Sequence, residues 1–262
     1  ECLGCELDDI VVFGADTDIS PYDSGSYASS TAYLTGTAVV KTCEALKEKI
    51  LHKAAKYLET GAEELEFDGK RVYKLACGED GTKKEISIKD LANRVQCANE
   101  DALQVTQSHS SPISPPPFMA GAAEVEVDLE TGQVELIKFA AAVDCGTPLN
   151  ENLARVQTEG GLVQGIGMAL YEDVSYSKDG KVHENSFMQY KVPSRLDVGR
   201  VQVEFESSFE PTGPFGAKSI GEVVINTPSP AIANAVYNAV GVRIRELPIT
   251  AEKVFKGMNG LD

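Results

Sequence analysis

Residues 124–143 read EVEVDLETGQVELIKFAAAV and carry the clearest strand pattern in the chain. Val125 and Val127 alternate with charged residues, and Thr131-Gly132 supplies a turn. A second apolar segment follows over residues 134–143. Alternation on either side of a glycine turn is typical of a β-hairpin with one buried face. We therefore predict an antiparallel hairpin in the second half of the chain.

A helix is expected directly after this hairpin, over residues 151–170. Four glycines interrupt it, and each disfavours a helix by about 1 kcal/mol relative to alanine. They are Gly160, Gly161, Gly165 and Gly167. Glycine at this density indicates either another backbone packed against that face or a ligand lying along it near Gln157 and Gln164. The glycine spacing does not match the dinucleotide-binding fingerprint.

Helices and strands are mixed along the rest of the chain, so the predicted fold class is α+β. In the first half we expect a long helix whose inward face runs from Val39 to Tyr57, followed by a hairpin that turns at Asp68-Gly69. A strand at Ile86 and Ile88 and a short helix near residues 91–95 complete this half. In the second half we expect strands around Val174, over residues 182–192 and over residues 201–205, and a last helix from a Thr227 cap to Gly241.

A proline-rich segment over residues 107–118 separates two parts of the chain. Proline removes a backbone donor and fixes the backbone angle, so this segment cannot form a helix or a central strand. We predict two mixed α/β lobes, over residues 1–106 and 119–262, joined by this connection.

The composition excludes several classes of protein. The 262 residues contain 40 Asp and Glu against 24 Lys and Arg, for a formal charge of -16. This charge repels nucleic acid and anionic membrane surfaces, and no apolar run approaches the roughly 20 residues of a membrane span. We expect neither nucleic acid nor membrane as a partner.

The cysteines and histidines favour a cytoplasmic protein without a protein-ligated metal. The six cysteines are scattered and no secretory leader is present, so reduced thiols are expected. Cys2 and Cys5 form a lone C-x-x-C pair, which we interpret as ordinary thiols at a frayed end. The three histidines lack ligand spacing.

Two loops could carry chemistry. Residues Ala28, Ser29, Ser30 and Thr31 offer small side chains, hydroxyls and backbone amides at an expected helix start, where anions bind readily. Taken alone, the run favours an ordinary Ser/Thr cap, because serine-rich helix starts are common. Glu222 lies between a glycine-rich turn and an apolar segment, so it should be partly desolvated, as suits a general base. An ordinary surface glutamate is the alternative. A hydrolase based on Ser108 and His109 lacks the G-x-S-x-G elbow.

In combination, these motifs resemble the molybdopterin-binding subunit of the molybdenum hydroxylases, the family of xanthine dehydrogenase, aldehyde oxidoreductase and nicotinate dehydrogenase. The resemblance rests on blocks that follow one another in order over nearly the whole chain. They lie at residues 16–39, 124–132, 144–150, 157–167, 190–193, 216–222 and 231–252. The implied fold is the C-terminal molybdopterin-binding region of the xanthine oxidase family.

The resemblance also implies roles for individual residues. Ala28, Ser29, Ser30 and Thr31 would line the pterin cofactor through amides and hydroxyls, and Gln157 would hydrogen-bond near the molybdenum ligands. Lys218 would supply positive charge near the cofactor loop, to which Gly221 belongs. Glu222 would be the catalytic base that deprotonates a molybdenum-bound hydroxide, so that water-derived oxygen attacks an electron-poor carbon and hydride passes to a sulfido or selenido ligand.

The implied enzyme is a molybdenum hydroxylase that is active only with its partner subunits. Its cofactor would be molybdenum-molybdopterin, in a dinucleotide form of the cytosine type if the protein is bacterial, with 2Fe-2S and FAD on partner subunits. The partners would be an N-terminal or large molybdopterin subunit, an iron-sulfur subunit, an FAD subunit and a small-molecule substrate. An N-heteroaromatic substrate is expected, with nicotinate favoured; xanthine or another purine, an aldehyde, or a non-catalytic assembly role are the alternatives.

The family's earlier half, with most substrate-contacting side chains, has no counterpart in this sequence. The chain also opens at Glu1 without a methionine. Two explanations fit: an excised C-terminal piece, or a naturally split subunit similar to the medium molybdopterin subunit of nicotinate dehydrogenase.

Overall fold

The computed structural model describes residues 1–14, 16–76 and 83–261, which form two compact units. Unit 1 consists of Glu1–Gly25 and Leu34–Pro112, and unit 2 consists of Ser26–Tyr33 and Ile113–Asp262. Neither unit is continuous in sequence, because the eight residues from Ser26 to Tyr33 belong to unit 2 although unit 1 residues flank them. Cys77 lies outside the described residues.

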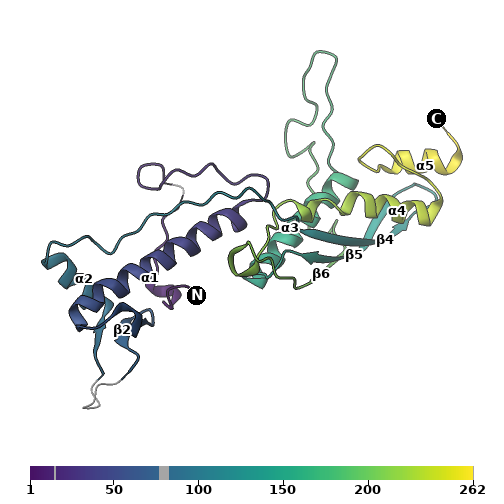
Figure 1. The fold of residues 1–262 in the computed structure, drawn as a ribbon. Coiled ribbons are helices and arrows are strands. Elements are labelled where there is room, and N and C mark those ends of the chain that lie inside the picture. The colour runs from purple at the N-terminus through teal and green to yellow at the C-terminus, as the bar shows by residue number, and fades with distance from the viewer. Residues whose placement is uncertain (15, 77–82, 262) are drawn as a thin grey trace. The chain divides into compact units, whose positions relative to one another are not determined.

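Unit 1 is a long helix packed against a small antiparallel sheet (Figure 1). Its elements are α1 (Gly36–Leu58), β1 (Leu65–Phe67), β2 (Arg71–Lys74), β3 (Glu85–Ser87) and α2 (Ile88–Cys97), with short 3-10 turns at Leu7–Asp9 and Ala62–Glu64. Ile50, Ala54 and Leu58 recur every four residues along α1 and are buried. The predicted inward face is therefore correct around Ile50, but Val39 is exposed.

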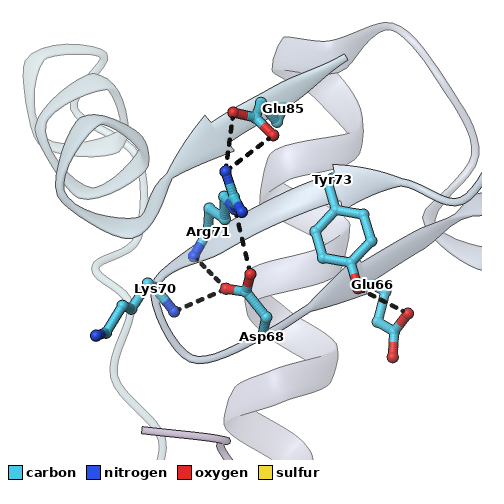
Figure 2. A network of polar contacts seen from close by, with 6 residues as sticks. All are labelled: Glu66, Asp68, Lys70, Arg71, Tyr73 and Glu85. Atoms are coloured by element: carbon cyan, nitrogen blue, oxygen red, sulfur yellow. Dashed lines mark hydrogen bonds and ion pairs between the residues drawn. The ribbon is translucent and has the colours of Figure 1, made fainter. Parts of the chain in front are cut away.

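The β1–β2 hairpin turns where the sequence predicts it, at Asp68-Gly69. The Asp68 carboxylate accepts hydrogen bonds from the backbone amides of Arg71 and Lys70, and these bonds hold the pKa of Asp68 below its ordinary value. Figure 2 shows the Arg71 guanidinium between Asp68 and Glu85, which ties the turn to β3. Because these groups are exposed, the ion pairs contribute little to stability and mainly fix the register.

Unit 2 is a three-stranded sheet with helices packed on it (Figure 1). Its elements are β4 (Phe118–Val127), β5 (Val134–Asp144), α3 (Glu151–Leu170), β6 (Arg200–Phe205), α4 (Pro228–Val240) and α5 (Ala251–Asn259), with short 3-10 turns at Pro214–Gly216 and Val223–Ile225. β4 and β5 form the predicted antiparallel hairpin, and β6 pairs with β5 in parallel. The core lies between the sheet, α3 and α4, around Phe139, Leu162 and Ile232, all fully buried.

The glycines of α3 allow close packing. A Cβ added at Gly161 would lie 2.2 Å from Val224 Cγ2, and one at Gly165 would lie 2.7 Å from Pro228 Cγ. At Gly167 it would lie 2.1 Å from Glu172 Oε1, whereas Gly160 has open space around it. Close packing against neighbouring segments therefore accounts for three of the four glycines.

Three sequence predictions for unit 2 are wrong. The strands expected around Val174 and over residues 182–192 are not formed; a loop with a single β-bridge, from Tyr176 to Val182, takes their place. The polar groups of this loop bond to one another, as where the Glu184 carboxylate accepts hydrogen bonds from Ser175. Thr227 precedes α4 but makes no side-chain cap, and its hydroxyl is buried without a described partner. α4 is also not the last helix, since α5 follows it.

The helix α5 has a sequence signal that the analysis missed. Thr250 Oγ1 accepts a hydrogen bond from the Lys253 amide at 3.2 Å, which is a regular N-cap, and Gly260 ends the helix in a left-handed conformation. None of the described helices combines the length and the apolar character needed to cross a bilayer.

Candidate functional site

Three distant segments of unit 2 meet at Glu222. Ser29 Oγ donates a hydrogen bond to Glu222 Oε2 at 2.8 Å, although the two residues lie 193 positions apart. Gln157 Nε2, on α3, donates to the Gly221 carbonyl at 3.4 Å. The structure thus brings together Ser29, Gln157, Gly221 and Glu222, all of which the sequence analysis selected.

Ser29 lies in a strained turn. Ala28 and Ser29 have φ of 49° and 56°, the left-handed region that non-glycine residues rarely adopt. Local hydrogen bonds hold this turn: Ser30 Oγ donates to the Tyr27 carbonyl and Thr31 Oγ1 donates to Ser26 Oγ. Strained backbone of this kind costs on the order of 1 kcal/mol or more per residue and is concentrated at functional sites.

The run from Ala28 to Thr31 is therefore not the simple helix start that the sequence suggests. A π-helical turn over Thr31–Thr35 separates it from α1, which begins at Gly36. The hydroxyls of Ser30 and Thr31 donate within the turn, and the hydroxyl of Ser29 donates to Glu222. The turn thus directs one hydroxyl, that of Ser29, at the carboxylate.

The Glu222 loop is anchored from behind. Val224, two residues after Glu222, is buried against Gly161 of α3. On the other side, a Cβ added at Gly221 would lie 3.1 Å from Ser29 Oγ, so a larger residue at position 221 would press on the turn. Glu222 itself is exposed, and the partial burial expected for it is not formed in this chain.

Lys218 is neutralised by an acidic neighbour. Its ammonium group lies 2.7 Å from Asp144 Oδ2, and the two side chains are only 9% and 19% exposed. Burial opposes ionisation of Asp144, but hydrogen bonds from Lys218, from Ser208 Oγ and from the Gly146 amide outweigh it and lower the pKa of Asp144. Lys218 therefore holds its loop to the end of β5, and the Asp144 carboxylate already balances the charge of Lys218.

Asp144 is the residue that the sequence analysis missed as a member of this site. It begins the block over residues 144–150, one of those on which the family resemblance rests. The Cys145 carbonyl also accepts the Lys218 amide at 2.7 Å. The end of β5 and the Lys218 loop are thus joined by both backbone and side chains.

Gln157 and Lys218 also border a pocket of about 230 Å³. Most of its walls are apolar, which is typical of a site that holds an organic ligand with a few polar groups. The apolar wall residues include Ala32, Pro148, Leu149, Leu153, Ala154, Ala217 and Ile220. A larger pocket of about 370 Å³, between Glu159 and Arg195, borders none of the predicted site residues.

Comparison with known proteins identifies the family. Residues 1–199 match the sequence profile described as the molybdopterin cofactor-binding domain. The chain belongs to this family. The molybdenum hydroxylase resemblance inferred from the motifs is thereby confirmed.

Individual members of the family are similar over nearly the whole chain. The probable hypoxanthine oxidase of Escherichia coli is 34% identical over 260 residues, which cover 98% of this chain and 27% of that protein. The gamma subunit of the 6-hydroxypseudooxynicotine dehydrogenase complex of Paenarthrobacter nicotinovorans is 31% identical, over 97% of this chain and 33% of that subunit. The chain thus spans about a third or less of these relatives.

A solved structure of the family has the same fold. The crystal structure of the Cu,Mo-CO dehydrogenase in its carbon monoxide reduced state superposes with a TM-score of 0.86 at 28% identity. The match covers 99% of this chain and 33% of that one. The predicted mixed α and β fold of the molybdopterin-binding region is confirmed.

The groups at Glu222 fit the pterin part of the family's cofactor. The polar groups are neutral: the Ser29 hydroxyl, which donates to Glu222 and can still accept, and the Gln157 carboxamide, which has a second N–H group besides the one that donates to Gly221. Such a set suits a neutral, polar heterocycle, and Gly221 leaves the space that a side chain would fill. Within the described ranges, no group of three or more His, Cys, Asp and Glu side chains could hold a metal ion.

Proposed function

We propose that this chain forms part of the active site of a molybdenum hydroxylase, with Glu222 as the general base. The observation that carries the proposal is the hydrogen bond of 2.8 Å from Ser29 to Glu222, formed beside the contact of Gln157 with Gly221. These contacts join the residues to which the family resemblance gives cofactor and base roles. The molybdenum cofactor, when bound, supplies the oxidising centre of the reaction.

Each residue then has a distinct task. The turn from Ala28 to Thr31, through backbone amides and through hydroxyl oxygens that act as acceptors, and the second N–H group of Gln157 hold the pterin. Ser29 fixes Glu222 through Oε2, and Glu222 takes up a proton at Oε1. Because Glu222 is exposed in this chain, the rest of the assembled enzyme has to exclude water from it.

We further propose an N-heteroaromatic substrate that is hydroxylated at an electron-poor carbon, with nicotinate as the first candidate. Two relatives support this class, since their names refer to the oxidation of hypoxanthine and of a nicotine derivative. The CO dehydrogenase similarity keeps other substrates open, so purines and aldehydes belong in the same assay.

The proposed assembly is a cytoplasmic complex of a two-lobed molybdopterin subunit, an iron-sulfur subunit and an FAD subunit. One relative is named as the subunit of a dehydrogenase complex, which supports a multi-subunit enzyme. The proposal includes a cytosine-dinucleotide form of the cofactor in a bacterial host, and an N-terminal molybdopterin partner that completes the substrate pocket.

The test is Glu222→Gln in the assembled enzyme. A positioned general base contributes about 10² to 10⁴ in rate, so kcat should fall at least about a hundredfold while molybdenum content is unchanged. Metal analysis and steady-state rates with nicotinate, hypoxanthine and an aldehyde measure both quantities.

Glu130→Gln is the matched control for this test. It makes the same change of charge in the exposed β4–β5 turn and should leave every rate unchanged. Turnover by Glu222→Gln at the rate of the unmodified enzyme would contradict the proposed role. Loss of molybdenum would show instead that Glu222 is needed for cofactor binding.

A further inference from the structure

The N-terminal segment of unit 1 is not a frayed end, contrary to the sequence analysis. Leu3 packs against the core cluster of unit 1. Cys5 Sγ donates to the Gly69 carbonyl at 3.5 Å, and Lys70 Nζ forms an ion pair with Glu6 at 2.5 Å. The segment is thus held both by apolar contacts and by the β1–β2 turn.

The contact between the segment and this turn is close. A Cβ added at Gly69 would lie 2.3 Å from the Gly4 carbonyl oxygen and 2.7 Å from the Cys5 amide nitrogen. Only a residue without a side chain allows the two backbones to approach this closely. The positions of Cys2 and Cys5 are therefore set by the fold.

This placement brings a third cysteine, Cys43 of α1, next to the pair. Cys43 lies on the same face of α1 as Leu46 and Ile50, three and seven residues later, and Leu3 packs against the cluster that contains both. Figure 1 shows the N-terminal segment beside α1. Cys2, the neighbour of Leu3, and Cys5 both lie close enough to the Cys43 thiol to raise its pKa.

All three sulfur atoms are free thiols on partly buried residues. Burial first, and then the Cys2 and Cys5 thiols, raise the pKa of Cys43. A raised pKa lowers the thiolate fraction of Cys43, and the thiolate is the nucleophile. Neighbouring thiols of this kind can be oxidised to a disulfide.

We propose that Cys2 and Cys43 form a reversible disulfide when the chain meets a peroxide. The Cys2 thiolate attacks one peroxide oxygen, the O–O bond breaks, and Cys2 becomes a sulfenic acid with release of water. The Cys43 thiolate then attacks this sulfur, the S–O bond breaks, a second water leaves and the S–S bond forms. The two thiols lose two electrons in total, and the peroxide accepts them.

The disulfide would close a covalent loop that contains the strained turn with Ser29. Cross-linking the ends of a segment lowers the conformational freedom of everything between them in the unfolded chain. The cluster would thus connect the redox state of the surroundings to the stability of the segment that carries Ser29.

The experiment treats the purified full chain with one equivalent of hydrogen peroxide and then blocks the remaining thiols with iodoacetamide. Non-reducing digestion and mass spectrometry should find one linked peptide pair, Cys2 with Cys43. The pair should be lighter than the two free peptides by two hydrogen atoms, and dithiothreitol should reverse the link.

Variants sharpen the result. Cys2→Ser and Cys43→Ser should each abolish the link, whereas Cys5→Ser and the exposed control Cys97→Ser should retain it. The proposal is overturned if Cys2 pairs with Cys5 or Cys77, if links form only between copies of the chain, or if Cys2 is oxidised to sulfinic acid without any link. The mapping on the unmodified chain decides the question even if a variant folds poorly.

Discussion

The two sides of the Glu222 site are held in place by different physics. The Glu222 loop is fixed by burial: Val224 packs against the glycine face of α3, and the partly buried pair of Lys218 and Asp144 braces the preceding residues. The Ser29 turn is fixed by short-range hydrogen bonds and carries left-handed backbone at two residues. Changes behind Glu222 should therefore affect global stability, whereas changes in the turn should act locally.

The largest effect is expected from Lys218→Met. The substitution leaves the Asp144 carboxylate partly buried without its cation, which should cost about 3 kcal/mol, at the low end for broken buried pairs. Urea unfolding of the full chain measures the loss. The double variant with Asp144→Asn should recover much of it, and a double variant as unstable as the single one would contradict this explanation.

The same pair predicts the direction of a pH effect. Since the pKa of Asp144 is lowered in the folded chain, its contribution is present above the pKa of the unfolded state and is lost as pH falls through the folded value. The stability difference between the unmodified chain and Lys218→Met should therefore shrink below about pH 4. A difference that stays constant from pH 7 to pH 3 would exclude this pair as its source.

Adjacent glycines of α3 offer a matched test of the packing behind Glu222. Gly161→Ala forces a methyl group to within 2.2 Å of Val224 Cγ2 and should cost about 2 kcal/mol through overpacking. Gly160→Ala places the same methyl group in open space and should stabilise the chain by up to about 1 kcal/mol through helix propensity. Denaturation midpoints of the two variants should move in opposite directions, and equal shifts would show that the packing is not tight.

The smallest effect is expected in the turn itself. Ala28→Gly relieves left-handed strain but makes the unfolded chain more flexible, so the net change in stability should stay within about 1 kcal/mol. Calorimetry measures it. A loss of several kcal/mol would mean that the Ala28 side chain makes contacts as important as those of Val224.

Local sequence patterns predicted helices and strands correctly where the apolar residues follow a single regular spacing. The helix expected over residues 151–170 has the bounds of α3, and the valine alternation from Val125 marks the β4–β5 hairpin. The same reasoning failed over residues 182–192, where short apolar runs resemble strands but no neighbouring strand pairs with them. It also missed α5, which is only nine residues long.

The site required a different kind of information. The contact between Ser29 and Glu222 spans 193 positions, and no local periodicity encodes such a distance. The family resemblance selected both residues, but it gave neither their hydrogen bond nor the pair of Asp144 with Lys218. The exposure of Glu222 was also missed, because burial depends on what surrounds the loop and not only on its apolar neighbours.

The discontinuous course of the chain limits how this fold can be rearranged by recombination. Unit 2 contains Gln157, Lys218 and Glu222 in its continuous part, but Ser29 reaches it from the eight residues that interrupt unit 1. A crossover after Pro112 would exchange Glu222 and Lys218 for those of another protein, but it would keep the original Ser29, whose hydroxyl orients Glu222. Relatives should therefore inherit both units together. Chimaeras joined at this point should keep most of their stability but lose catalytic activity.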